Sequence, residues 1–312
     1  MNGQEQRTAR YVESSDGVRI AVYDRPSRSG PDAPTVLCLH GYPDHAGVWD
    51  GVVEILAERF RVITYDARGA GRSAAPAGRD GYRLDRLAED TAAVLSLLPP
   101  DEPVHLVGHD WGGIQAWHVA TDPGLSERIA SLTTVSGPSL DHAGAWLRGL
   151  RPGPRFGARL RQALHSYYIG FFLLPWLPEF AWRRGLLDRA VRADHAGYVR
   201  SREDAVRGLN LYRANMAGRR WQGRPAATEI PCQVLAPDKD RFVTPALQFE
   251  APEPFTQRLF RRTIDGGHWV LSRQPQRVAG PVAELVDLVE HGLLGDALRR
   301  SEFRRTPTDV AS

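Results

Sequence analysis

The strongest constraint on the fold of this chain is the pentapeptide GHDWG at residues 108–112, which directly follows the largely apolar run VHLV. Two glycines flanking three residues after such a run are typical of a sharp turn from a strand into a helix, where the backbone packs too closely for side chains. Asp110 occupies the apex, where most sequences of this pattern carry serine. A carboxylate attacks saturated carbon and forms an alkyl ester, whereas a serine attacks carbonyl carbon. Asp110 therefore predicts a substrate with an electrophilic sp³ carbon, such as an epoxide or an alkyl halide.

The segments around this turn alternate between two periodicities. Short β-branched runs bounded by loops indicate buried strands at residues 35–39, 61–66 and 129–135. Between and around them, apolar side chains recur at helical spacing over residues 52–60, 84–98 and 114–120. This order predicts the α/β class, with a mostly parallel sheet flanked by helices and a functional site at the carboxyl ends of the strands.

Two loops at predicted strand ends make the fold more specific. The loop HGYPD begins at His40, and the loop DARGAGRS begins at Asp66. Together with the turn at Asp110, and in this order, they resemble the α/β-hydrolase fold over roughly residues 10–290. Within that fold, a nucleophilic aspartate followed by tryptophan is similar to epoxide hydrolases and haloalkane dehalogenases. The HGYPD loop looks more like the HGFPE loop of epoxide hydrolases than like the corresponding loop of haloalkane dehalogenases.

The resemblance also implies where an oxyanion is held. In this fold one donor follows the nucleophile and the other comes from the loop after the third strand, which points to the backbone N–H groups of Trp111 and Tyr42. The neighbouring residues are expected to support these loops, and they are His40, Gly41, Pro43 and His109.

The remaining members of a catalytic triad are expected in the order acid, then histidine. Apolar runs at residues 231–236 and 258–264 read as the last strands, and each ends in a loop with suitable residues. The family pattern Gly-x-x-Asp-x-x-Val aligns Asp240 with the acid, although Pro237 replaces the glycine, and Asp238 is the alternative. His268, which follows two glycines after the final strand, is the expected base.

Residues 138–224 separate the two parts of the predicted core, residues 1–137 and 225–295, and read as an inserted helical lid. Epoxide hydrolases of this family carry one lid tyrosine seven residues before a proline in an aromatic run, and a second in a segment similar to Asn-x-Tyr-Arg-x-Asn. Tyr168 and Tyr212 match these patterns, with Tyr167 as the alternative to Tyr168. Phenols stay protonated at neutral pH and suit the protonation of an opening epoxide.

The composition limits the other possibilities. A net charge of +3 is too small to indicate a nucleic-acid surface, and no metal-ligand spacing or phosphate-binding loop is present. Two cysteines in predicted strands and a polar start favour a cytoplasmic protein, and no apolar run is long enough to span a membrane. The chain also resembles the hydrolase half of proteins in which a short-chain dehydrogenase follows. The tail at residues 296–312 shows no dinucleotide fingerprint and reads as a helix remnant that becomes disordered, so no cofactor is expected.

The lid run FFLLPWL at residues 171–177 has two interpretations. It could form the lid's own core, the commoner arrangement, or a surface that makes weak contact with lipid head groups, because many arginines surround it: Arg148, Arg151, Arg155, Arg159, Arg161, Arg183 and Arg184. A large apolar lid favours bulky, hydrophobic substrates.

Three functions follow from these residues. The first is an epoxide hydrolase that uses water and no cofactor to convert an epoxide to a vicinal diol. The second is a related hydrolase with the same aspartate and another leaving group, such as a haloalkane dehalogenase. The third is a non-catalytic member of the fold that binds a ligand. The sequence leaves the particular epoxide and the oligomeric state open.

Overall fold

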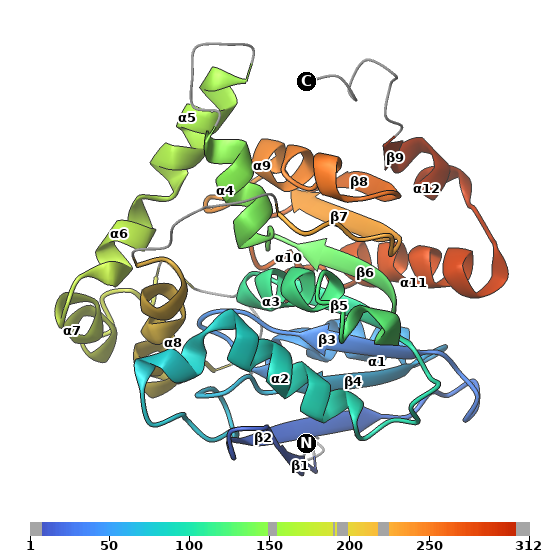
Figure 1. Cartoon of the computed structure of the whole chain (residues 1–312), viewed down its shortest axis with the longest axis horizontal. Coiled ribbons are helices and arrows are strands. Elements are labelled where there is room, and N and C mark those ends of the chain that lie inside the picture. The colour runs from blue at the N-terminus through green and yellow to red at the C-terminus, as the bar shows by residue number, and fades with distance from the viewer. Residues whose placement is uncertain (1–7, 149–154, 190, 192–198, 218–224, 304–312) are drawn as a thin grey trace.

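A nine-stranded sheet runs through the computed structural model, which describes residues 8–148, 155–189, 191, 199–217 and 225–303 (Figure 1). Its spatial order is β1-β2-β4-β3-β5-β6-β7-β8-β9, and neighbours from β4 to β8 pair in parallel, whereas β1, β2 and β9 are antiparallel to their neighbours. The strands are β1 (Arg10–Glu13), β2 (Arg19–Arg25), β3 (Thr35–Leu39), β4 (Arg61–Tyr65), β5 (Val104–His109), β6 (Ile129–Val135), β7 (Cys232–Pro237), β8 (Leu259–Ile264) and β9 (Glu302–Phe303).

Helices cover both faces of this sheet (Figure 1). The core helices are α1 (Asp50–Leu56), α2 (Leu84–Leu95), α3 (Trp111–Ala120), α9 (Pro245–Glu250), α10 (Val270–Arg273), α11 (Gln276–His291) and α12 (Asp296–Ser301). The lid helices are α4 (Leu140–Arg148), α5 (Phe156–His165), α6 (Tyr167–Leu173), α7 (Leu177–Arg183) and α8 (Arg202–Asn215), which follow β6 and precede β7 in the chain. The observed order of elements thus confirms the predicted α/β class with an inserted helical segment.

The alternation of side chains along the strands explains the three layers. On β3, Leu37 and Leu39 join an apolar cluster with residues of α2 and α3, whereas Val36 and Cys38 join a second cluster with residues of α1 and α11. Because successive side chains of a strand point to opposite faces, an unbroken apolar run needs cover on both sides.

Some elements differ from the sequence expectation. Strands β1 and β2 and the two-residue strand β9 were not predicted, and the first part of the tail forms α12 and β9, so Leu298 is buried against the core. The helix remnant expected there is present, but it is followed by strand pairing through Phe303. The disorder predicted for the tail cannot be compared, because residues 304–312, with Arg151 of the lid, lie outside the described part of the chain.

The parallel core sets the position of the loops discussed below. Tyr42 follows β3, Asp110 follows β5, Asp240 follows β7 and His268 follows β8, and all four loops leave the carboxyl edge of the sheet. None of the described helices is long and apolar enough to cross a bilayer. Both cysteines are buried thiols in β3 and β7, and the cytoplasmic location remains a prediction.

Candidate active site

Asp110 lies on a strained turn between β5 and α3. Its backbone has φ of 53° and ψ of −121°, a conformation that non-glycine residues rarely adopt and that is found mainly at functional sites. The flanking glycines make the turn possible, because a Cβ on Gly108 would overlap the carbonyl of Gly112, and one on Gly112 would overlap the carbonyl of Leu39. The turn places the Asp110 side chain beyond the end of the sheet, at the start of α3.

The Asp110 carboxylate has two polar neighbours from distant parts of the chain. The backbone N–H of Tyr42 donates to Oδ1 at 2.7 Å, and Nε2 of His268 lies 3.5 Å from Oδ2. Trp111 is the first residue of α3, so its N–H is at the helix N-terminus, which favours negative charge. One carboxylate oxygen is therefore held by a donor, and the other faces the imidazole.

Asp240 and His268 form a buried pair beside Asp110. Nδ1 of His268 lies 3.1 Å from Oδ2 of Asp240, while Oδ1 of Asp240 accepts the backbone N–H groups of Phe242 and Val243 at 2.8 and 3.1 Å. Asp238, the alternative acid, is exposed and accepts the N–H of Gly266 instead. The structure brings Asp240, and not Asp238, to His268.

Opposing influences set the charge of His268. Burial by itself would lower the pKa of the imidazole, but the Asp240 and Asp110 carboxylates outweigh burial and raise this pKa to about 10. Burial pushes the pKa of Asp240 upward, and the imidazolium with its hydrogen bonds brings it below the ordinary value. In the resting site His268 is therefore an imidazolium that lies between the carboxylates of Asp110 and Asp240.

Two lid tyrosines lie over this group. Tyr168 of α6 and Tyr212 of α8 pack edge-to-face with ring centroids 6.1 Å apart, and Tyr212 contacts the ring of Trp111 at 5.0 Å. Burial raises the pKa of both phenols, and the Asp110 charge raises each further. Tyr167, the alternative, is 78% exposed and points away. Both phenols, the partly buried Tyr168 and the buried Tyr212, therefore remain protonated donors near the Asp110 carboxylate.

Two histidines brace the loops around the site. His40 donates from Nδ1 to the Gly41 carbonyl at 2.9 Å and accepts the N–H of Ala67 at Nε2, so it is neutral. His109 donates from Nε2 to the carbonyl of His268 at 2.8 Å, and burial with the nearby His268 lowers its pKa to about 4. The peptide bond between Tyr42 and Pro43 is cis. These contacts fit the supporting positions predicted for the two histidines.

The geometry agrees with comparison to known proteins. The family model described as the alpha/beta hydrolase fold matches residues 34–274. The chain belongs to this family. Among curated relatives of this chain, "Probable oxidoreductase EphD" of Mycobacterium tuberculosis is 37% identical over 96% of this chain, and the chain spans 53% of that relative's length. Human "Epoxide hydrolase 4" is 28% identical, with 78% of this chain and 70% of that protein covered.

Solved structures share the same α/β-hydrolase architecture. An epoxide hydrolase from Bacillus megaterium, solved with its diol product, superposes with a TM-score of 0.73 at 22% identity, covering 89% of this chain and 100% of the other. Epoxide hydrolase VrEH1 from Vigna radiata gives a TM-score of 0.68 at 20% identity, covering 92% and 99%. At such identities the likeness establishes the fold of this chain.

One group of residues near the candidate site was not singled out from the sequence. Asp44, the last residue of the HGYPD loop, is buried and accepts from Nε of Arg200 at 2.6 Å and from Nε1 of Trp269 at 2.8 Å. The Arg200 guanidinium also lies over the Trp269 ring, 4.9 Å from its centroid. This group joins the start of α8 to the loops of Tyr42 and His268. Asp44 stands inside a recognisable motif, whereas Arg200 offers no local signal.

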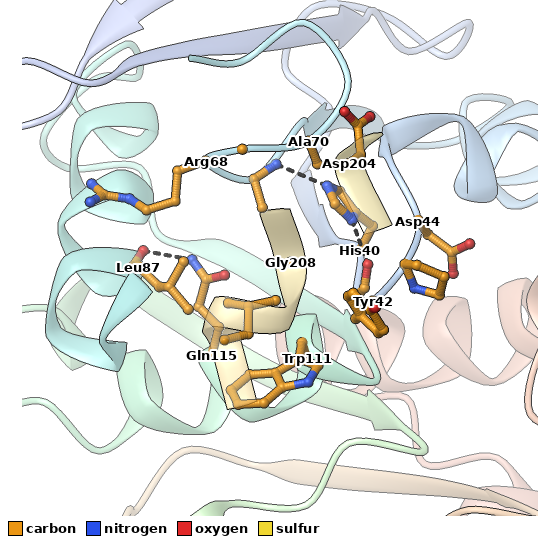
Figure 2. Close-up of a pocket in the computed structure, with 15 residues that line it drawn as sticks. His40, Tyr42, Asp44, Arg68, Ala70, Leu87, Trp111, Gln115, Asp204 and Gly208 are labelled. Atoms are coloured by element: carbon orange, nitrogen blue, oxygen red, sulfur yellow. Dashed lines mark hydrogen bonds between the residues drawn. The ribbon is translucent and has the colours of Figure 1, made fainter. Parts of the chain in front are cut away.

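A small cavity lies behind the Tyr42 loop. Figure 2 shows it between His40, the loop of Arg68 and Ala70, and Gly208 of α8. It leaves about 30 Å³ for the centres of water molecules, which suffices for about two of them at the usual need of ~10–15 Å³ each. Its lining does not include Asp110 or His268. The cavity is therefore a place for water behind the loop, and it is too small for an organic substrate.

The described side chains offer no metal centre. No group of three or more His, Cys, Asp or Glu residues in the described ranges is arranged to hold a metal ion. The polar groups at the carboxyl edge are a carboxylate, an imidazole–carboxylate pair, phenols and backbone donors. This set suits nucleophilic displacement followed by hydrolysis.

Proposed function

We propose that this protein is an epoxide hydrolase, which converts a bulky, apolar epoxide and one water molecule to a vicinal diol through an ester of Asp110. The observation that carries the proposal is the pair of protonated phenols near the Asp110 carboxylate, the partly buried Tyr168 and the buried Tyr212. An opening epoxide produces an alkoxide, which needs a proton donor at that place. A halide leaving group needs nitrogen donors instead, and only Trp111 stands where one is expected.

In the first step, an oxygen of Asp110 attacks an epoxide carbon and the ring C–O bond breaks. Tyr168 and Tyr212 donate hydrogen bonds to the departing oxygen. The alkoxide gains one proton and Asp110 loses its negative charge. Since that charge helps to raise the pKa of His268, the imidazolium becomes more acidic at this moment and can supply the proton through a tyrosine. The ester, the alcohol and a neutral imidazole result.

In the second step, neutral His268, oriented by Asp240, takes a proton from water, which attacks the carbonyl carbon of the ester. The N–H groups of Tyr42 and Trp111 stabilise the tetrahedral oxyanion. Collapse of this intermediate breaks the ester C–O bond, and the leaving oxygen takes the second proton of the former water, so that the diol, the Asp110 carboxylate and the His268 imidazolium result. The apolar walls that the lid contributes, among them Phe172 and Leu209, suit a bulky hydrophobic substrate.

The intermediate provides the central test. In ¹⁸O-labelled water, a single turnover should leave the label in Asp110 and not in the diol, because water attacks the ester carbonyl. The His268→Gln variant should still open the ring and accumulate protein whose mass increases by that of the substrate. Label that appears directly in the first diol, with no adduct in the variant, would show that water attacks the epoxide itself.

The tyrosines provide the test of substrate class. Tyr168→Phe and Tyr212→Phe should each slow ester formation by roughly one to two orders of magnitude, because each removes a transition-state donor. The double variant should lose nearly all ring opening, whereas hydrolysis of a preformed ester should change little. Tyr167→Phe is the matched control, since this exposed neighbour should leave both steps unaltered. Wild-type rates in both single variants, or ready release of halide with no epoxide turnover, would contradict the assignment.

A further inference from the structure

Helix α5 of the lid shows a reversed distribution of polarity. Phe156, Leu160 and Leu164 recur every four residues, so they form one stripe along the helix, and all three are exposed. The buried residue of α5 is Gln162, whose side chain accepts from Thr244 and donates to the Phe242 carbonyl. A helix at the surface of a globular protein normally buries its apolar stripe. The apolar stripe of α5 is therefore exposed to solvent, although apolar side chains favour burial.

The same exposure continues along the next two helices. Helices α5, α6 and α7 follow one another down the side of the molecule that faces away from the sheet (Figure 1). Tyr167 at the start of α6 is 78% exposed, and Trp176 before α7 is 74% exposed. Among the described residues, every large exposed apolar side chain except Tyr11, Ile55 and Leu293 lies between residues 156 and 199. We call the exposed side chains of α5 to α7 the outer lid face.

The charged residues around the outer lid face are mostly positive. Between residues 142 and 187 the sequence contains seven arginines and a single acidic residue, Glu179. Glu179 is paired with Arg213 at 2.6 Å, and Arg155 is paired with Glu250 at 3.2 Å, so the exposed positive charge of these helices comes from other arginines. Arg161, Arg183 and Arg184 are exposed on the same helices, and the Arg184 guanidinium lies over the ring of Phe180. Apolar and aromatic side chains bordered by arginines match the composition of surfaces that lie in the head-group region of anionic lipid.

We propose that the outer lid face docks onto an anionic lipid surface, with Leu164, Tyr167 and Trp176 entering the head-group boundary and the arginines contacting lipid phosphates. A second copy of the chain suits this face less well. A two-fold dimer through it would place the same arginine cluster of each copy against the other. The proposal does not depend on the reaction at Asp110, and its test measures binding without turnover.

The test compares the binding of the 312-residue chain to two kinds of vesicle by co-sedimentation. Binding is expected to vesicles that contain phosphatidylglycerol, to be weak on phosphatidylcholine alone, and to fall as salt is added. Trp176→Asn should reduce binding at least several-fold, and asparagine suits the left-handed backbone of this residue, whose φ is 49°. Arg183→Gln with Arg184→Gln should weaken binding by about fivefold for each charge removed.

Leu293→Gln is the control, because Leu293 is equally apolar and 59% exposed but lies on the core after α11. It should bind vesicles as the wild type does, and the thermal midpoints of all variants should agree. Failure of the wild type to bind anionic vesicles would overturn the proposal, as would equal losses in the Trp176 and Leu293 variants. Sedimentation velocity adds a further outcome: a dimer abolished by Leu164→Gln, without vesicle binding, would make the outer lid face a contact between copies instead.

Discussion

The imidazole of His268 lies between the carboxylates of Asp110 and Asp240, so its charge is coupled to theirs. With a pKa of about 10 it is an imidazolium at neutral pH in the resting site. A protonated imidazole cannot activate water. The proposed reaction therefore depends on the loss of the Asp110 charge in the first step. Formation of the ester removes that charge, which lowers the pKa of His268 and allows the imidazole to act as a base.

This coupling predicts a different pH dependence for each step. The rate of ester formation should stay level through neutral pH and fall as pH rises through about 10, where the imidazolium is lost. Ester hydrolysis should increase with pH through a lower pKa, because one of the two carboxylate charges is gone. Stopped-flow single turnovers resolve the two steps, and His268→Gln should lack the second dependence. A hydrolysis pKa at or above 10 would contradict this coupling.

The same shift affects folding. The pKa of His268 is raised above its ordinary 6.5, so the folded chain holds this proton more tightly than the unfolded chain. The resulting stability is complete below pH 6.5 and is lost as pH rises toward 10. The wild type should therefore lose more stability than His268→Gln over this interval.

At the scale of elements, α8 is joined to the loop that follows β3. The Tyr42 hydroxyl donates to the Ala205 carbonyl at 2.8 Å, and its ring lies against Gly208, where an added Cβ would come within 2.6 Å of a ring carbon. Glycine within a helix is otherwise unfavourable by about 1 kcal/mol relative to alanine. The ring of Tyr42 explains why glycine occupies this position.

Gly208→Ala should accordingly destabilise the protein by about 1–3 kcal/mol, as overpacking commonly does. In a Tyr42→Ala background the same change should be neutral or stabilising, because the ring is absent and the helix gains alanine. Urea unfolding of the four proteins gives the coupling between the two sites. Gly280→Ala in α11 is the control, since a Cβ there meets no atom within 4 Å. Additive effects of Gly208→Ala and Tyr42→Ala would show that the ring does not restrict α8.

The sequence alone was sufficient to predict the strands that are buried on both faces. Strands β3, β4 and β6 fall at their predicted positions to within a residue, because an apolar run bounded by loops permits few alternatives. Strand β1 was missed because it lies at the sheet edge and is largely exposed. The sequence indicated a helical lid but not which face of each lid helix lies inside, so the outward apolar stripe of α5 was not predicted. The run at residues 171–177 likewise divides between the two sides of the lid, because Phe172 is buried and Trp176 is exposed.

The predicted site residues belong to local motifs, which explains why the sequence alone could single them out. Asp110, Asp240 and His268 each follow a strand, and the parallel sheet brings such loops to one edge. The contact between Asp44 and Arg200 spans 156 residues and has no such rule. Only the folded chain reveals that pair.

At the scale of the whole molecule, a buried ion pair joins the N-terminal strands to α2. Both oxygens of Asp90 accept from Arg68, and neither side chain is exposed. Arg68 also bonds Asp16 in the turn between β1 and β2. Removing one partner of such a pair leaves a charge buried without compensation.

Arg68→Met should therefore cost about 3–5 kcal/mol of stability, measured by urea unfolding. Burial raises the pKa of Asp90 and Arg68 opposes that rise, so without Arg68 the loss should be larger at alkaline than at acidic pH. The double variant Arg68→Met with Asp90→Leu should recover much of the loss. A double variant as unstable as the single one would locate the effect in the contacts of Arg68 to Asp16 and to the Gly81 carbonyl instead.

The lid enters the chain between two strands that are neighbours in the sheet, since β6 pairs with β7 from Leu132 and Cys232 to Val135 and Leu235. Because these strands are parallel, the chain leaves β6 after Val135 at the carboxyl edge of the sheet and enters β7 at Cys232 at the other edge. The strand pairing fixes the separation of these two points, which therefore does not depend on how many residues lie between them. A lid of different length or composition can be exchanged at these ends without a change in strand register. Recombination between relatives can in this way alter what is admitted to the site while the residues at the sheet edge are inherited intact.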